Sequence, residues 1–374
     1  MLLRAVRSRV RNAPFPCPAK VKSMRQFGKA LSTASALVLS FALLAGCGPR
    51  KEAEAPTKGE LNLYTARHYD ADLELYKAFT KATGIKVNRL EMGPDQLIER
   101  MKAEGDASPA DVILTSDAGA LWRAEQAGLF QPIQSAVLNE KIPAGLRDPQ
   151  NEWFGFSRRA RVIAYDKAKV KPEEVATYEA LAEPRFKGKV CVRSSDNVYN
   201  LSLMSALIER WGQDKALAWA KGVVANMARP PQGGDIEQIK AIGAGVCDVA
   251  LTNTYYYLRL VASADAGDKA VVEKVTLAFP NLDGHGTHVN ISGGGVARYA
   301  PHKDAAVKFL EFLSTDEAQE IFAGANHEYP AVPSVKPPAL VAQYSNFTAD
   351  PMPVTVYGER QAEAQAVFDK AGWR

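Results

Sequence analysis

The sequence predicts an α/β protein with two lobes, and three observations support this prediction. The chain has 374 residues, about two to three times the size of a typical domain. Hydrophobic residues make up 47% of the chain and charged residues 24%, values typical of globular proteins. Short apolar segments alternate with amphipathic segments of helical period, as in sheets covered by helices. These observations exclude a disordered, collagen-like or multi-span membrane protein.

A first βαβαβ unit is predicted after residue 60. Its helices show apolar residues at helical spacing, and glycine or proline marks their ends. The expected elements are a strand at 61–64, a helix at 70–83 that Gly84 ends, a strand at 85–90, a helix at 94–103, a strand at 110–115 and a helix at 118–126. This order predicts parallel strands in one lobe.

A second unit begins near residue 189, and long extended segments separate it from the first. The expected elements are a strand at 190–192, a helix from the capping cluster 194–197 to 208, helices at 214–227 and 235–242, and strands at 248–251 and 275–279. The extended segments 154–166 and 286–300 would carry the chain into the second lobe and back. We therefore assign 60–157 and 284–330 to the first lobe, and 158–283 and 331–374, with C-terminal helices, to the second. Gly293-Gly294-Gly295 indicates close backbone packing in the returning strand.

Residues 1–46 have the layout of a secretory signal. An uncharged run at 30–46 follows Arg25 and Lys29, and it is too short and too rich in serine for a confident membrane span. Residues 44–47 (Leu-Ala-Gly-Cys) resemble a bacterial lipobox, so we expect lipidation of Cys47; the alternative is an ordinary signal with a chance cysteine. Met24 would begin a leader of normal length, so residues 1–23 could lie upstream of the true start. The polar segment 47–59 reads as a tether to the membrane of a periplasmic lipoprotein.

The net charge of +4 comes from this leader. Residues 1–46 hold eight basic and no acidic residues, and the remaining 38 basic and 42 acidic residues give the body a net charge of −4. A nucleic-acid partner is therefore not expected. Apart from Cys17 in the leader and Cys47, only Cys191 and Cys247 remain. An even pair in an oxidising compartment suggests one disulfide, and two buried free thiols are the alternative.

Signatures of catalysis are missing. The sequence has no GxGxxG, GxxxxGK[ST], HExxH or GxSxG motif. His285 and His288, in HGTH, would chelate zinc from a helix, but the flanking glycines favour a turn. An enzyme is not expected.

Tyrosines lie at three places where a predicted strand ends and a helix begins. Tyr69 follows the first strand, Tyr199 follows the strand at 190–192, and Tyr255 and Tyr256 follow the strand at 248–251. Ligands of open α/β sheets bind at the carboxyl ends of strands, so we expect these phenols to face one cleft. A sugar or polyamine pocket lined by tyrosines would look the same.

Phenolate is a hard, anionic oxygen ligand with a free pKa of about 10, so a strongly Lewis-acidic cation is needed to remove its proton at neutral pH. Ferric iron fits this requirement. Four phenolates on Fe3+ leave one negative charge, which a nearby arginine would offset. Strand alternation predicts Arg159 and Arg161 on one face and Arg158 on the other.

At these residues the sequence resembles the ferric-iron-binding periplasmic proteins that serve ATP-driven iron importers. The resemblance runs from about residue 61 to the C-terminus. It is carried by YTARHY (64–69), WFGFSRRARV (153–162), SSDNVYN (194–200) and NTYYY (253–257). It implies a two-lobed, type II-like periplasmic binding protein fold with crossing hinge strands and iron in the cleft.

The resemblance also implies roles for single residues. Tyr69 would be the ligand from the first lobe, and Tyr199, Tyr255 and Tyr256 the ligands from the second. His68 is a ligand in some relatives and not in others. Arg159 matches a position near the iron or near a carbonate, whereas Tyr257 would only pack.

These inferences lead to the hypothesis of a monomeric, lipid-anchored receptor that passes ferric iron to an inner-membrane ABC permease. A receptor for an oxyanion, thiamine or a polyamine on the same fold is the alternative. Whether a carbonate completes the iron shell, and whether ferrous iron also binds, stays open at this point.

Overall fold

The computed structural model of the protein describes residues 59–374. The expected signal sequence (1–46), the alternative start at Met24, the lipidation site Cys47 and the tether up to residue 58 lie outside the described residues. Within 59–374, none of the helices combines the length and apolar character required to cross a bilayer.

Nine strands form one continuous sheet in the described part of the chain. Their bounds are β1 (Gly59–Thr65), β2 (Ile85–Glu91), β3 (Val112–Thr115), β4 (Phe154–Asp166), β5 (Val190–Cys191), β6 (Val249–Asn253), β7 (Val275–Ala278), β8 (Val289–Val296) and β9 (Tyr329–Pro330). The strand predictions from the sequence are confirmed to within a few residues.

Helices cover this sheet. Their bounds are α1 (Asp72–Thr83), α2 (Pro94–Glu104), α3 (Ala118–Gln126), α4 (Ala136–Lys141), α5 (Val198–Trp211), α6 (Gln213–Asn226), α7 (Asp235–Gly243), α8 (Thr254–Ala262), α9 (Ala266–Lys274), α10 (Lys303–Leu313), α11 (Asp316–Ala325), α12 (Ala339–Ala342), α13 (Val356–Glu359) and α14 (Gln361–Ala371). Short 3-10 helices lie at Gly105–Ala107, Ala144–Leu146, Pro172–Val175, Tyr178–Ala182 and Pro184–Phe186. Gly84 ends α1 in the left-handed conformation (φ 73°), as its position in the sequence predicts.

The sheet has the order β2-β1-β3-β8-β4-β6-β5, with β7 and β9 paired to β4. The predicted parallel pairing holds inside each βα unit, where β1 pairs with β2 and β3, and β5 with β6. The pairings of β8 with β3, and of β4 with its neighbours, are antiparallel. The sheet is therefore mixed, because two strands that cross between units must run against the strands they join.

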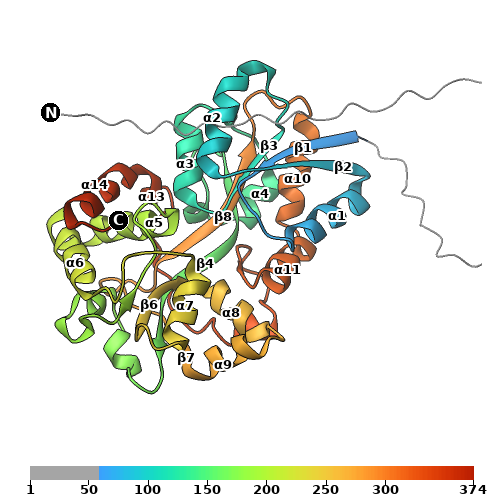
Figure 1. The fold of residues 1–374 in the computed structure, drawn as a ribbon. Coiled ribbons are helices and arrows are strands. Elements are labelled where there is room, and N and C mark those ends of the chain that lie inside the picture. The colour runs from blue at the N-terminus through green and yellow to red at the C-terminus, as the bar shows by residue number, and fades with distance from the viewer. Residues whose placement is uncertain (1–58) are drawn as a thin grey trace, which may run out of the picture. The chain divides into compact units, whose positions relative to one another are not determined.

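β4 is the strand that connects the two parts of the sheet. Its first half pairs with β8 through Ala160, and its second half pairs with β6 from Arg161 onward. β4 and β8 run side by side through the middle of the molecule (Figure 1). The fold is thus the expected two-lobed α/β arrangement with crossing strands. The assignment of 60–157 with 284–330, and of 158–283 with 331–374, to separate lobes stays a prediction.

The three consecutive glycines lie in β8, where backbones approach closely. A Cβ atom on Gly293, Gly294 or Gly295 would collide with a carbonyl oxygen of Phe154, Ile113 or Glu152, respectively. The run therefore serves close packing of β8 between β3 and β4, as the sequence predicts.

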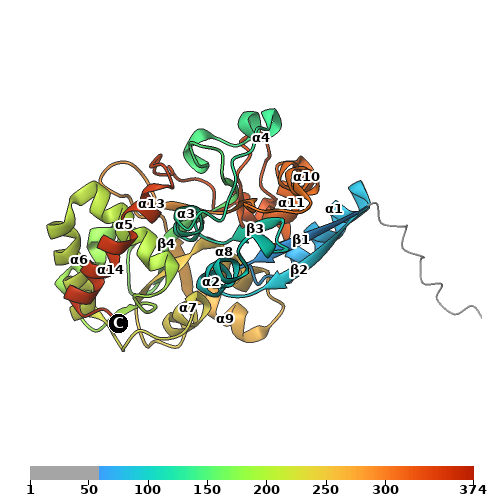
Figure 2. The same cartoon turned by 90° about the horizontal axis from the view of Figure 1, so that it is seen from above.

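Helices on either side of these strands bury aromatic clusters. In the first part, Phe79 of α1 packs against Phe309 and Phe312 of α10, with ring centroids 5.0 and 5.5 Å apart. In the second part, Trp219 of α6 lies 6.0 Å from Trp373 at the C-terminus. α13 and α14 pack on α5 and α6, and Figure 2 shows these helices gathered at one end of the molecule.

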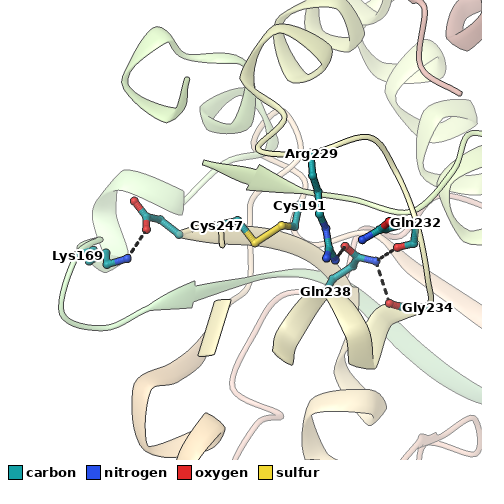
Figure 3. The surroundings of a disulfide bond; sticks show 8 residues. Lys169, Cys191, Arg229, Gln232, Gly234, Gln238 and Cys247 are labelled. Carbon is teal, nitrogen blue, oxygen red and sulfur yellow. Dashed lines mark hydrogen bonds and ion pairs between the residues drawn. A yellow bond between two sulfur atoms is a disulfide. The ribbon is translucent and has the colours of Figure 1, made fainter. Parts of the chain in front are cut away.

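The two cysteines of the body form a disulfide. Cys191 ends β5 and Cys247 precedes the neighbouring strand β6, with Cα atoms 5.9 Å apart. Figure 3 shows this bond beside the Gln238 amide, which donates to the carbonyl oxygens of Gln232 and Gly234. The bond links the strand that leads to Tyr199 with the strand that leads to Tyr255.

Replacing both cysteines by alanine is expected to lower the free energy of unfolding. The bond joins residues separated by 56 positions, and closing a loop of that length is worth about 4 kcal/mol in the chain-entropy model. Urea denaturation of the double variant and of the reduced parent protein measures the loss. Equal midpoints for oxidised and reduced protein would contradict a stabilising bond.

Candidate metal centre

Four tyrosine side chains from three distant segments meet in the interior. The hydroxyl oxygen of Tyr69 lies 3.1 Å from that of Tyr255, which donates a hydrogen bond of 3.2 Å to the hydroxyl of Tyr199. The ring of Tyr256 lies 4.2 Å from the ring of Tyr255. All four side chains are at least nine-tenths buried. The structure thus brings together the four tyrosines selected from the sequence.

Each tyrosine lies where a strand passes into a helix. Tyr69 lies between β1 and α1, Tyr199 is in the first turn of α5, and Tyr255 and Tyr256 are in the first turn of α8. The side chain of Asn197 caps α5 by accepting a hydrogen bond from the backbone N–H of Tyr199. Helix N-termini carry partial positive charge, so this placement favours phenolate over phenol.

Tyr257 and His68 are neighbours of the cluster in the sequence, but they lie outside its hydroxyl contacts. The hydroxyl of Tyr257 donates to the carbonyl of Val275 at 3.0 Å, so this third tyrosine of the NTYYY motif packs away from the phenol cluster. His68 is exposed, and its ring centroid lies 4.8 Å from that of Tyr69. His285 is exposed at the end of a turn that its N–H closes on the carbonyl of Leu282, whereas His288 lies just before β8 and is buried against Tyr357.

The environment separates the pKa values of the tyrosines. Burial raises the pKa of Tyr69, Tyr255 and Tyr256 above the ordinary value. Burial also acts on Tyr199, but the Arg159 charge and the hydrogen bonds it accepts outweigh burial and lower its pKa.

The three arginines of the crossing strand β4 alternate as the sequence predicts. The guanidinium carbon of Arg159 lies 5.5 Å from the Tyr255 ring centroid, and that of Arg161 lies 5.9 Å from the Tyr199 ring centroid. Arg158 instead donates through Nε to the carbonyl of Pro330 at 2.9 Å. Arg158 is partly buried on the other face of the strand.

A buried carboxylate, Glu328, holds the arginines near Tyr69 and Tyr255. Its Oε1 lies 2.7 Å from Nη2 of Arg159, and its Oε2 lies 3.3 Å from Nη1 of Arg67 and accepts from Ser157 at 2.6 Å. Arg67 also makes a bidentate pair with Asp72, at 2.7 and 2.8 Å. Burial raises the pKa of Glu328, but Arg67 and Arg159 outweigh burial and hold that pKa below its usual range.

A second buried carboxylate, Asp235, holds an arginine near Tyr199 and Tyr255. It pairs with Arg161 at 2.8 Å and accepts from the backbone N–H of Asn253 at 2.6 Å. Arg161 also donates to the side chains of Asn200 and Asn253, which adjoin Tyr199 and the NTYYY helix. This network therefore ties α5 and α8 to the crossing strand.

The charge next to the phenols comes from a residue that the sequence analysis missed. Two carboxylates, Asp72 and Glu328, neutralise Arg67 and Arg159. The guanidinium carbon of Arg259 lies 4.6 Å from the ring centroid of Tyr69, 5.2 Å from that of Tyr255 and 5.5 Å from that of Tyr256. Within residues 59–374, Arg259 has no carboxylate within 4.0 Å. Arg259 is therefore a cation over the cluster without a carboxylate partner in the described residues, and Arg161 and Arg193, which share the single carboxylate Asp235, add a second excess positive charge beside Tyr199.

A cleft of about 510 Å³ opens beside the cluster. Residues before α1 and α2 line one wall, and Arg193, Ser194 and the start of α5 line the other. His68 and Tyr199 both reach this cleft. The cleft thus lies between the parts of the chain that carry His68 and Tyr199.

The donors gathered here suit a hard cation. Phenolate oxygens are hard ligands, and the hydroxyls of Tyr69, Tyr199 and Tyr255 bond to one another. The buried Nε of Arg159 has no hydrogen-bond partner within the described residues, so it is available to a further oxygen. In the same part of the chain, no cluster of three or more His, Cys, Asp or Glu is arranged to hold a metal.

The site residues that were not selected from the sequence differ in how clearly the sequence marks them. Arg259 follows Tyr255 and Tyr256 by four and three residues, a spacing that places it on the same face of α8. Arg67 stands inside YTARHY and could have been selected with that motif. Glu328 and Asp235 stand in segments without a motif, and only the fold brings them to the arginines.

Glu328→Gln is expected to lower the free energy of unfolding by about 3 kcal/mol at pH 7, because it removes one partner from a buried ion pair. The lowered pKa of Glu328 means that its contribution is complete above its unfolded pKa of about 4.3 and is lost as pH falls through the lower, folded-state pKa. The difference between parent and variant should therefore shrink in acid. Guanidinium denaturation measures it.

The matched control is Glu363→Gln, which breaks an exposed pair with Arg360 and should cost less than about 1 kcal/mol. Equal costs for the two variants would show that the Glu328 pair does not brace the site.

Comparisons with known proteins show the family of the chain. Residues 74–349 match the family described as bacterial extracellular solute-binding protein. Iron uptake protein A1 of Synechocystis sp. is 48% identical over 357 residues, which cover 94% of this chain and 99% of the relative. A Trichodesmium protein (IdiA, FutA), solved with iron and citrate, is 54% identical with a TM-score of 0.81, covering 84% of this chain and all of that one. A ferric binding protein from Campylobacter jejuni is 40% identical with a TM-score of 0.81, with the same coverage. The chain therefore belongs to the bacterial extracellular solute-binding proteins, a non-enzymatic class of receptors.

Proposed function

We propose that this protein captures ferric iron through the phenolates of Tyr69, Tyr199, Tyr255 and Tyr256 and delivers it to an ABC permease in the inner membrane. The observation that carries the proposal is the meeting of these tyrosines from three strand ends in one buried cluster. The signal sequence and lipidation of Cys47 would hold the receptor at the membrane in the periplasm.

Electrostatics favour a trivalent cation in this cluster. Four phenolates around Fe3+ carry a net charge of −1, and cations lie close to them: Arg259 is over the rings of Tyr69, Tyr255 and Tyr256, and Arg161 and Arg193, which share Asp235, are over Tyr199. A strongly Lewis-acidic trivalent cation is the kind of ion that can displace the protons of four buried phenols at neutral pH. Relatives described as ferric iron-binding proteins support iron as the cargo.

The remaining coordination positions face the cleft. We infer that a small oxyanion such as carbonate, or His68, completes the iron shell from this side. Arg193 on the cleft wall and the unpartnered Nε of Arg159 would stabilise an anion. His68, which lines the same cleft, would then be a ligand only in the absence of that anion.

The ligands are divided unequally between the two units. Tyr199, Tyr255 and Tyr256 follow β5 and β6, whereas Tyr69 follows β1 on the other side of the crossing strands. We infer that iron binds first to the three tyrosines of the second unit and that Tyr69 joins as the cleft closes. The fourth phenolate then supplies the affinity difference that favours the closed state.

Ferric iron added to the iron-free protein is expected to produce a broad visible absorption band, because phenolate donates electron density to Fe(III). Tyr255→Phe removes one anionic ligand and keeps the ring, so iron affinity should fall at least tenfold, or about 1.4 kcal/mol. Competition with a chelator, followed at the visible band, measures the affinity.

Tyr257→Phe is the matched control, because its hydroxyl bonds to Val275 outside the cluster. Stoichiometric iron in a colourless protein would contradict tyrosine ligation. The same affinity in both variants would remove Tyr255 from the ligand set.

Tyr69→Phe is expected to weaken iron binding without abolishing it, and to reduce closure more than Tyr255→Phe does. The phenylalanine ring keeps its stacking with Arg67 and Arg259, at 4.8 and 4.6 Å, but it cannot bind the metal. Small-angle scattering with and without saturating ferric iron reports the compaction of each variant. Full compaction of Tyr69→Phe would mean that another interaction drives closure.

A further inference from the structure

A second pocket lies on the face of β4 opposite Arg159 and Arg161. It has a volume of about 220 Å³, and Arg158 of β4, Val289 of β8 and Tyr329 of β9 contribute to its walls. Pro330 of β9 also lines it, with Pro333, Pro337, Ser345 and Phe347 of the segment after β9. The pocket is separate from the cleft beside the tyrosines, which it shares no residue with.

Arg158 contributes a cation to this pocket, and this cation has no carboxylate partner in the described residues. Its neighbours Arg159 and Arg161 each pair with a buried carboxylate, at 2.7 and 2.8 Å. Within residues 59–374, no carboxylate lies within 4.0 Å of the Arg158 guanidinium, whose Nε is bonded to the carbonyl of Pro330. Burial lowers the pKa of Arg158, and no carboxylate of the described residues offsets the cost of desolvating its charge. The two terminal nitrogens are therefore free to form a bidentate bond with a carboxylate.

The rest of the pocket is apolar and aromatic. Phe347 stacks on Phe279 with ring centroids 4.6 Å apart and an interplanar angle of 14°. Tyr329 meets the edge of Phe347 at 5.5 Å, and its hydroxyl is already bonded to the carbonyl of Tyr344. The hydroxyl of Ser345 donates to the carbonyl of Val341. These walls offer little to the polar edges of a sugar, an amino acid or an inorganic ion, and they favour a flat hydrocarbon body.

We propose that this pocket binds a small monocarboxylate with an aromatic or branched apolar body, its carboxylate on Arg158 and its body against Phe347 and Tyr329. The volume lies below the range of about 300 to 1,000 Å³ usual for pockets of drug-sized ligands, so the ligand is of fragment size. The proposal does not depend on iron, because its lining excludes all four tyrosines of the candidate metal centre.

Benzoate is a suitable probe, and the purified iron-free chain is the protein to use. Isothermal titration is expected to give a Kd of about 1 mM, which is about −4 kcal/mol. Benzamide, which lacks the charge, and phosphate, which lacks the apolar body, should each displace bound benzoate only with an affinity at least about tenfold weaker. Phosphate that competes with benzoate at equal affinity would overturn the proposal, as would no benzoate binding up to about 10 mM.

Variants locate the bound probe. Arg158→Met removes the charge, and Ala349→Leu fills the pocket while keeping Arg158; each should weaken benzoate at least about tenfold. Arg193→Met removes a cation from the other cleft and should leave benzoate affinity unchanged. Circular dichroism checks that the variants fold. If Arg158→Met does not fold, the benzoate affinity of Ala349→Leu tests the proposal instead. Loss of binding in Arg193→Met alone would place the anion in the cleft and overturn the proposal.

Discussion

The carboxylate of Glu328 lies between the guanidinium groups of Arg67 and Arg159, and the arrangement of the tyrosine cluster depends on this contact. Arg67 belongs to the loop that carries Tyr69, Arg159 to the crossing strand, and Glu328 to the segment that returns after α11. Three parts of the chain are thus joined at one buried anion. Arg67 and Arg159 carry two positive charges, and Glu328 and Asp72 carry two negative charges. The group is therefore electrically balanced, and neither arginine is an unpaired buried charge.

Asp235 is the corresponding buried carboxylate further along the same face of β4. It binds Arg161 and the backbone at the end of β6, while Arg161 reaches the amides beside Tyr199 and Tyr255. Buried polar networks of this kind specify a single arrangement only when their members are satisfied. The two networks together leave the tyrosine hydroxyls bonded to one another. The hydroxyls of Tyr69, Tyr199 and Tyr255 are therefore joined by neutral hydrogen bonds, and charged pairs surround them.

One strand separates the two binding regions of the molecule. Alternation along β4 sends Arg159 and Arg161 toward the tyrosines and Arg158 toward the pocket behind them. The sequence predicted this division, because a period of two needs only the assignment of an extended strand. It did not predict that Arg158 would be buried without a carboxylate. That outcome depends on the segment after β9, which covers the strand with prolines and aromatic residues.

Several features follow from the sequence by itself. The α/β class, most strand and helix positions and the role of Gly293 to Gly295 are local, because period, caps and glycine act within a few residues. The placement of four tyrosines after strands was also visible, since the carboxyl ends of strands meet at one edge of a sheet. Only the tertiary structure decided which charges face the cluster. Glu328 and Asp235 reach it from segments that are distant in sequence, and neither period nor motif encodes such contacts.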